Sequence, residues 1–263
     1  MAVLAVSAML VASAKAQSTD NAGNYGTISS STFTNGSNEG TGYNPWQFSN
    51  TGTTSENGEI LADSTLNAGG GHLGINSGNS AAWGLYANNS QTASAVRPFS
   101  SALQIGQTVS IDFENGYIQT GGTVGLGLQD AGSTNRIEFF FVGGNSSYTL
   151  QTATGANTGI GFTNTGLQVS FTLASADTMN VSVTGLNGNS ASYSTNGIAL
   201  EGTPGSAIDQ IRLFNFNAGS GTAYNDFYNN LTISAVPEPS SLALVGLGML
   251  GVLSLRRSRN RRK

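Results

Sequence analysis

Between Tyr43 and Ser234 the chain repeatedly alternates apolar and polar residues over short stretches. The clearest stretch is LQVSFTL, residues 167–173, whose apolar residues fall on one face and whose polar residues fall on the other. A period of two residues is typical of a strand that is buried on one side only. The pattern therefore predicts a protein built mainly from β-strands.

Several other stretches show the same period. In TVSIDFENG, residues 108–116, the alternation buries Val109, Ile111 and Phe113 ahead of a turn at Asn115-Gly116. Further strands are predicted over AAWGLYA (81–87), TVGLGLQ (123–129), NRIEFFFV (135–142), NVSVTGL (180–186), DQIRLFNF (209–216) and DFYNNLTIS (226–234). These strands are enough to form two sheets.

Short strands with one apolar face, separated by Gly- and Asn-rich turns, favour antiparallel sheets that pack their apolar faces together. We therefore predict an all-β fold, an antiparallel β-sandwich of the jelly-roll type, over residues 41–235, preceded by a flexible Gly/Ser/Asn-rich leader over 17–40. Trp83, which alternates with Leu85, is expected in the core. A β-helix is the runner-up, but it requires a repeat of about 20–25 residues that the sequence does not contain.

Composition and charge narrow the function. The chain has 36 glycines and only 9% charged residues, which disfavours long helices, and it has no cysteine for disulfides or thiolate metal sites. Residues 17–235 contain 13 acidic residues against Arg97, Arg136 and Arg212, so their net charge is 3 − 13 = −10. A body of this charge repels phosphate backbones, which excludes nucleic acid as its partner.

The first residues, MAVLAVSAMLVASAKAQS, have the apolar run and small-residue cleavage site of a secretory signal, although they lack a basic start. Ala14 and Ala16 form an A-x-A site directly before Gln17. We predict a signal peptide over residues 1–16. The alternative is a buried helix at the start of the domain.

The last segment, residues 236–263, has three parts. Val236, Pro237, Glu238 and Pro239 should be extended and accessible, because each proline removes a backbone donor and disfavours helix in the residue before it. Residues 241–255 carry no charge and reach about 22 Å as a helix, short of a ~30 Å hydrocarbon core. The cationic end consists of Arg256, Arg257, Arg259, Arg261, Arg262 and Lys263. These cations stay in the cytoplasm by the positive-inside rule, which predicts a short helix in the inner membrane and a body outside it.

This tail, with Pro237-Glu238-Pro239, a short Gly/Leu-rich helix and terminal arginines, resembles the PEP-CTERM sorting signal of Gram-negative bacteria. The resemblance implies processing by an exosortase, a membrane enzyme associated with exopolysaccharide production. It also implies export to the cell surface or extracellular matrix. The GLGMLG stretch in the tail matches a dinucleotide-binding pattern, but the chain ends 12 residues later, with no βαβ unit around it.

Asp112 and Glu114 are the candidate catalytic residues. They lie two apart on one predicted strand, so both carboxylates point to the same face, and paired carboxylates are what glycoside hydrolysis needs. SIDFE also resembles the E-x-D-x-E strand of laminarinase-like enzymes, but Ser110 stands where that family has its nucleophilic Glu. We therefore expect no enzyme activity, and keep an exported glycoside hydrolase or lyase as the alternative. His72, the only histidine, is expected in a loop or at a strand edge.

Ligand binding is the remaining function that the sequence suggests. The closing NDFYNNLTI is similar to the last strand of concanavalin A-like and carbohydrate-binding jelly rolls, which implies a sugar ligand. Sugars are recognised by aromatic faces beside polar groups. The candidate aromatic residues are Trp46, Tyr43, Tyr86 and Tyr117.

No cofactor is expected, although structural calcium is considered for an acidic exported sandwich, with Asp130 and Asp226 as weak candidate ligands. We predict a non-enzymatic surface or matrix protein that binds extracellular polysaccharide and interacts with exosortase and the export machinery.

Overall fold

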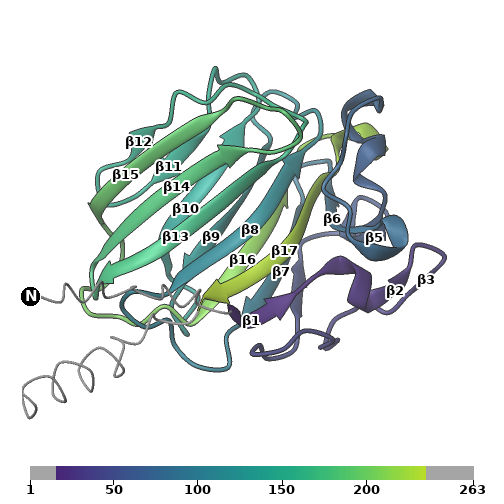
Figure 1. Cartoon of the computed structure of the whole chain (residues 1–263). Coiled ribbons are helices and arrows are strands. Elements are labelled where there is room, and N and C mark those ends of the chain that lie inside the picture. The colour runs from purple at the N-terminus through teal and green to yellow at the C-terminus, as the bar shows by residue number, and fades with distance from the viewer. Residues whose placement is uncertain (1–15, 235–263) are drawn as a thin grey trace, which may run out of the picture.

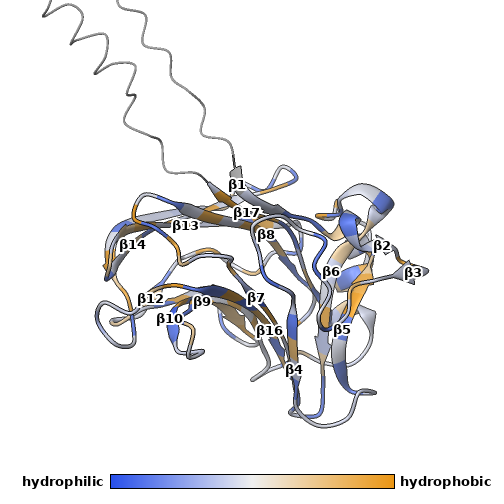
Figure 2. Cartoon of the chain, turned by 90° about the horizontal axis from the view of Figure 1, so that it is seen from below, coloured by the Kyte–Doolittle hydropathy of each residue, from blue (hydrophilic) through white to orange (hydrophobic). Residues whose placement is uncertain are grey.

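A computed structural model describes residues 16–234 and shows two antiparallel sheets packed face to face (Figures 1 and 2). The predicted all-β sandwich is therefore confirmed. Most of the predicted signal peptide, with Ala14, and the whole predicted tail from Val236, with its helix, lie outside the described residues. Within residues 16–234 no helix is long and apolar enough to cross a membrane.

The larger sheet has eight strands. Seven follow one another in the order β15 (Ser192–Ala199), β14 (Thr178–Gly185), β13 (Leu167–Ser175), β8 (Thr108–Asn115), β17 (Asp226–Ser234), β6 (Ala82–Ala87) and β5 (Asn57–Ala62). The eighth, β1 (Ala16–Asp20), also pairs with β17.

The smaller sheet has seven strands. Their order is β12 (Ala156–Asn157), β11 (Thr149–Gln151), β10 (Asn135–Val142), β9 (Thr123–Gln129), β16 (Gln210–Phe216), β7 (Thr92–Pro98) and β4 (Gln47–Asn50). The remaining elements are a hairpin of β2 (Gly26–Thr27) and β3 (Ser30–Ser31), and short 3-10 turns η1 (Ala22–Tyr25), η2 (Ser64–Gly69), η3 (Gly78–Ser80) and η4 (Thr222–Tyr224).

Every strand predicted from alternation is present, and Trp83 is fully buried as expected. Asn115-Gly116 does not close a hairpin, because the neighbours of β8 are β13 and β17 and the chain crosses to β9 in the other sheet. Strands β7 and β15 were missed for different reasons. β7 carries Arg97 on its buried face, whereas β15 is a polar edge strand of serines, threonine and asparagine.

Aromatic rings fill the space between the sheets. Phe139 stacks on Tyr148 with ring centroids 5.0 Å apart, and Phe113 stacks on Tyr228 at 5.2 Å. Burying a large apolar side chain of this kind contributes about 1.5–3 kcal/mol. Strands β8, β10 and β17 therefore place Phe113, Phe139 and Tyr228 in the core, where their burial stabilises the sandwich.

The prediction of a flexible leader over residues 17–40 is wrong. Tyr25 is fully buried and Phe33 nearly so, and both join the same core cluster as Trp46 and Trp83. Their hydrophobic burial, together with the pairing of β1 with β17, makes this segment an integral part of the sandwich. The sequence obscured this because its two aromatic residues are isolated among Gly, Ser and Asn.

The direction of β17 separates the two ends of the sandwich. Its first residue, Asp226, pairs with Asn115, and its last residue, Ser234, lies beside Ala16 of β1 (Figure 1). Nine residues of strand span about 30 Å. Ser234 therefore lies at the end of the sandwich opposite the loop that follows β8.

Candidate functional site

The carboxylate of Asp112 lies on the outer face of the larger sheet and is engaged by two neighbouring side chains. Gln168 donates to Oδ1 at 3.3 Å and Asn230 donates to Oδ2 at 2.7 Å. Asp112 is only 7% exposed, and this burial raises the pKa of the carboxyl despite the two hydrogen bonds. The group is thus tied into the sheet surface.

Glu114 lies on the same face under a covering loop, residues 63–76, hereafter the 63–76 loop. It is 1% exposed, and burial raises the pKa of its carboxyl to about 9, with a smaller contribution from the negative charge of Asp63. Nδ1 of His72 lies 3.4 Å from its Oε1. Among the described residues neither carboxylate oxygen has a hydrogen-bond partner of normal geometry. His72 lies in this loop, as the sequence predicted.

The two carboxyl groups therefore do not form an open pair in a substrate cleft. Glu114 is covered by the 63–76 loop, and Ser110 has its hydroxyl oxygen 2.7 Å from that of Ser170. Retaining glycoside hydrolysis needs two accessible carboxyl groups about 5 Å apart on either side of the bond. The geometry gives this chemistry little support.

The predicted aromatic binding residues are mostly internal. Trp46 is fully buried and Tyr43 is 5% exposed, so the expectation that their faces meet a ligand is wrong. The guanidinium of Arg97 lies 5.1 Å from the ring centroid of Trp46 and 5.2 Å from that of Tyr43. Both rings belong to the hydrophobic core cluster and lie beside this buried cation.

The other two candidates lie nearer the surface and do not form one site. The half-buried Tyr86 donates its hydroxyl to the carbonyl of Thr54 at 3.1 Å. Tyr117 is 47% exposed and packs edge-on against Tyr224, with ring centroids 6.0 Å apart. Tyr117 is therefore the predicted aromatic residue that solvent reaches best.

The prediction that Asp226 is a calcium ligand in a loop is wrong, because its side chain is fully buried. Tyr228 donates to its carboxylate at 2.5 Å and Asn215 donates at 2.6 Å, and burial raises its pKa to about 7. Asp130 accepts the backbone N–H of Thr134 at 2.9 Å in a turn. Over residues 16–234 no three His, Asp or Glu side chains gather as a metal site. Calcium binding stays a prediction without a defined ligand set.

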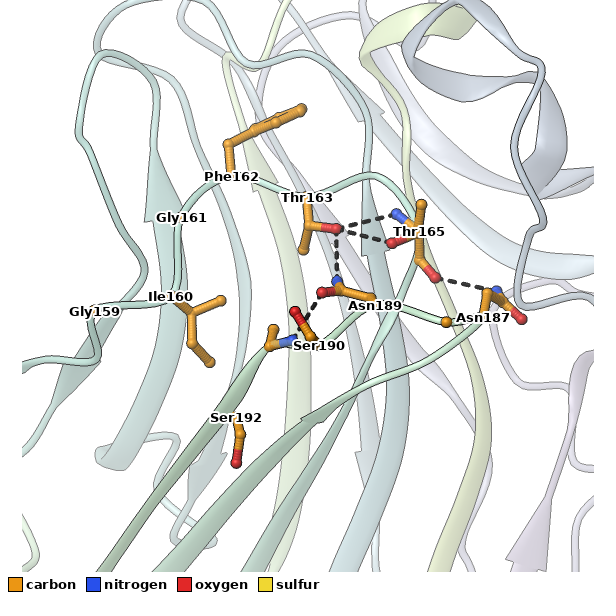
Figure 3. Close-up of a pocket in the computed structure, with 12 residues that line it drawn as sticks. Gly159, Ile160, Gly161, Phe162, Thr163, Thr165, Asn187, Asn189, Ser190 and Ser192 are labelled. Atoms are coloured by element: carbon orange, nitrogen blue, oxygen red, sulfur yellow. Dashed lines mark hydrogen bonds between the residues drawn. The ribbon is translucent and has the colours of Figure 1, made fainter.

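Figure 3 shows a pocket of about 560 Å³. The strand registers place it at the end of the sandwich opposite Ser234. It is formed by the connection between β12 and β13 and the connection between β14 and β15. The lining residues are Gly159, Ile160, Gly161, Phe162, Thr163, Thr165, Asn187, Gly188, Asn189, Ser190, Ala191 and Ser192. None of them is charged. Phe162 is 43% exposed and packs edge-on against Phe141, with ring centroids 5.8 Å apart.

Hydrogen bonds hold the pocket walls together. Asn189 donates to the hydroxyl of Thr163 at 2.8 Å, and Asn187 donates to the carbonyl of Thr165 at 3.0 Å (Figure 3). Asn187 also donates to the carbonyls of Leu73 and Gly74 in the 63–76 loop. It has φ of +54°, a left-handed conformation that asparagine tolerates. The pocket is thus a pre-formed structure joined to the loop that covers Glu114.

Three polar groups at the pocket have no hydrogen-bond partner in the described part of the chain. They are the hydroxyls of Ser190 and Ser192 and the amide oxygen of Asn187. Hydroxyls both donate and accept, and an amide oxygen accepts. The sequence analysis missed this site, because Gly/Thr- and Asn/Gly-rich stretches signal turns and do not show which turns meet.

One family model matches the chain, over residues 235–259, and it describes the PEP-CTERM protein-sorting motif. Residues 235–259 are a PEP-CTERM sorting motif. The resemblance drawn from Pro237, Pro239 and the terminal arginines is confirmed. The PEP-CTERM motif marks an exported protein that an exosortase-type system sorts and processes. It starts directly after Ser234, the last described residue, which lies at the end of the sandwich away from the pocket.

Several solved structures resemble the sandwich at low sequence identity, and no curated protein sequence matches the chain. Domain 4 of AbnA, a GH43 extracellular arabinanase from Geobacillus stearothermophilus in complex with arabinotriose, is 14% identical, with 85% of this chain and 93% of that chain covered and a TM-score of 0.42. A glycosyl hydrolase family 16 protein from Mycobacterium smegmatis is 11% identical, with 83% and 100% covered and a TM-score of 0.44.

A sialidase structure is 14% identical, with 58% of this chain covered and a TM-score of 0.42; the chain spans only 15% of that protein. Likeness at this level carries no argument about the ligand or the chemistry of the PEP-CTERM protein.

Proposed function

We propose that this exported protein is a non-enzymatic glycan-binding protein of the Gram-negative cell surface or extracellular matrix, and that the end pocket binds the sugar. In this proposal the predicted C-terminal helix holds the chain in the inner membrane until exosortase acts. The sandwich needs no cofactor. The observation that carries the proposal is an uncharged, pre-formed pocket with an exposed aromatic ring, at the end opposite the sorting motif.

The chemistry of the pocket supports this function. A sugar ring has an apolar face that stacks on an aromatic side chain and hydroxyls that pair with amide and hydroxyl groups. Phe162 provides the ring, and Asn187, Ser190 and Ser192 provide free polar atoms. The position of the pocket also leaves it unobstructed by the attachment point, since β17 separates the two by its full length.

The alternative, a glycoside hydrolase or lyase, rests on one favourable observation. A carboxyl with a pKa near 9 stays protonated at neutral pH, as a general acid must. This enzyme would need the 63–76 loop to open. Release of new reducing ends from a bound glycan, abolished by Glu114→Gln, would favour the enzyme over the binding protein.

The test is a glycan-binding assay on the full chain in mild detergent, with neutral and anionic polysaccharides, in calcium and in chelator. We expect binding to a neutral glycan in both conditions, and Phe162→Ala is expected to weaken it about tenfold, or about 1.4 kcal/mol, because the stacking surface is lost. Phe216→Ala is the matched control, since Phe216 is 38% exposed but lies on the smaller sheet away from the pocket. Failure to bind any glycan on the panel would overturn the proposal.

A further inference from the structure

The outer face of β14 and β15 carries four hydroxyl groups beside the pocket. Ser182 and Thr184 belong to β14, and Ser192 and Ser194 belong to β15; we call them the hydroxyl patch. Thr184 lies opposite Ser192 and Ser182 lies opposite Ser194. Residues that are opposite in an antiparallel pair point to the same face. The buried Val181 and Val183 alternate with them toward the core, so the patch faces outward.

These hydroxyls are unpaired, which distinguishes them from similar residues on the same sheet. All four are exposed, and none of the four bonds to another group in residues 16–234. Two strands away the same residue types pair with each other. Ser110 and Ser170 lie 2.7 Å apart between their hydroxyl oxygens, and Thr108 and Thr172 lie 2.8 Å apart. The patch therefore offers four hydroxyls that are all free, whereas on the neighbouring strands each of these hydroxyl pairs uses one donor and one acceptor internally.

The patch is continuous with the pocket. Ser192 belongs to both, since it lines the pocket and begins β15 (Figure 3). Opposite hydroxyls on paired strands are about 5 Å apart, and those two residues apart on a strand are about 7 Å apart. A molecule that occupies the pocket and extends past Ser192 would meet the other three hydroxyls on a regular grid.

The distribution of charged side chains in the sandwich restricts the charge that a ligand of the pocket and the hydroxyl patch can carry. The only Lys or Arg residues among residues 17–234 are the three arginines, and Arg97 and Arg136 are buried. Arg212 lies on the smaller sheet, with its guanidinium 4.0 Å from the carboxylate of Glu138. With 13 acidic residues in the body, an anionic polymer would be repelled and would find no cation at the pocket.

We propose that the pocket and the hydroxyl patch together bind a neutral linear polysaccharide, with the sugar at the chain end in the pocket and the following sugars across the patch. This inference rests on the proposed function and adds the ligand class and the way in which it binds. The patch has no aromatic ring, so it binds weakly alone. It contributes when the pocket already holds the chain end, because the following sugars are then at high effective concentration.

The inference is tested with neutral linear glucan oligosaccharides of two to six units, titrated calorimetrically into the full chain. We expect the affinity of the natural protein to rise with chain length. The triple variant Ser182→Ala, Thr184→Ala, Ser194→Ala retains the pocket and is expected to bind the disaccharide normally but the hexasaccharide about tenfold more weakly. The matched control is the triple variant Ser110→Ala, Ser170→Ala, Thr172→Ala, which removes the Ser110–Ser170 pair and the partner of Thr108 from the same sheet and should bind every length normally.

Several results would overturn the inference. These are affinity that does not depend on chain length, a patch variant that binds every length like the natural protein, or an absence of glucan binding. Tighter binding of oligogalacturonate, an anionic chain, would also do so. The proposed function survives these results if Phe162→Ala still weakens binding to some glycan on the wider panel. The proposed function is overturned only if the protein binds no glycan on that panel.

Discussion

Replacing Glu114 with glutamine is expected to raise the free energy of unfolding at pH 8 by about 5 kcal/mol. Burial raises the pKa of this carboxyl from 4.5 to about 9 in the folded protein. Between these two values the folded state holds a proton that the unfolded state has released, so stability falls as pH rises. The interval from 4.5 to 8 is 3.5 units, and each unit corresponds to about 1.36 kcal/mol.

The measurement is urea denaturation of both proteins from pH 5 to pH 9. The natural protein should lose stability across this range, whereas Glu114→Gln should lose much less, because the amide does not titrate. Glu39→Gln is the control, since Glu39 is exposed and its replacement should change stability by less than about 0.5 kcal/mol. Parallel pH profiles for Glu114→Gln and the natural protein would show that the carboxyl is not buried in this way.

Replacing Arg97 with methionine is expected to cost about 3–5 kcal/mol of stability, the usual penalty for leaving a buried charge without its partner. The side chains of Arg97 and Asp20 are both fully buried and form an ion pair, with 2.7 Å between Nη2 of Arg97 and Oδ2 of Asp20. Tyr25 also donates to Asp20 at 2.8 Å, and Arg97 donates to the carbonyl of Asn44 at 2.6 Å. Burial raises the pKa of Asp20 although Arg97 opposes the shift, so removing Arg97 favours the neutral acid further.

The double variant Asp20→Asn, Arg97→Met is the matched control for this pair. It removes both charges and should be more stable than Arg97→Met alone, because no uncompensated ion remains in the core. Urea denaturation measures the free energy of unfolding of the single and the double variant. Amide exchange over residues 16–46 should show that the single variant frees this segment from the sandwich first. Equal stability of the single and double variants would contradict a coupled buried pair.

The two buried clusters lie at different places and have different consequences. Asp20 and Arg97 hold the N-terminal segment, whose strand β1 pairs with β17 next to the start of the PEP-CTERM motif. Glu114 lies beneath the 63–76 loop, whose backbone accepts hydrogen bonds from Asn187 of the pocket. The loop over Glu114 is therefore hydrogen-bonded to the end pocket, whereas Asp20, the partner of Arg97, lies in the strand that pairs with the last residues of β17.

Local pattern alone predicted the strands of clear alternation, the sandwich and the sorting motif. Alternation in residues 167–173 reports which side chains share a face, and a motif such as Pro237-Glu238-Pro239 is contiguous in the chain. Both are properties of neighbouring residues. The strand pattern and the motif can therefore be recognised without information about tertiary contacts.

Only the tertiary structure decided which surfaces remain open. Trp46 was expected to face a ligand, but its ring packs in the core beside Arg97, a residue that is distant in the sequence. Glu114 was predicted to share one strand face with Asp112, but a loop from another part of the chain covers it. The pocket exists because residues 159–165 and 187–192 meet at one end of the sandwich. Burial and binding depend on contacts between distant segments, and an alternating pattern contains no information about which loops will meet.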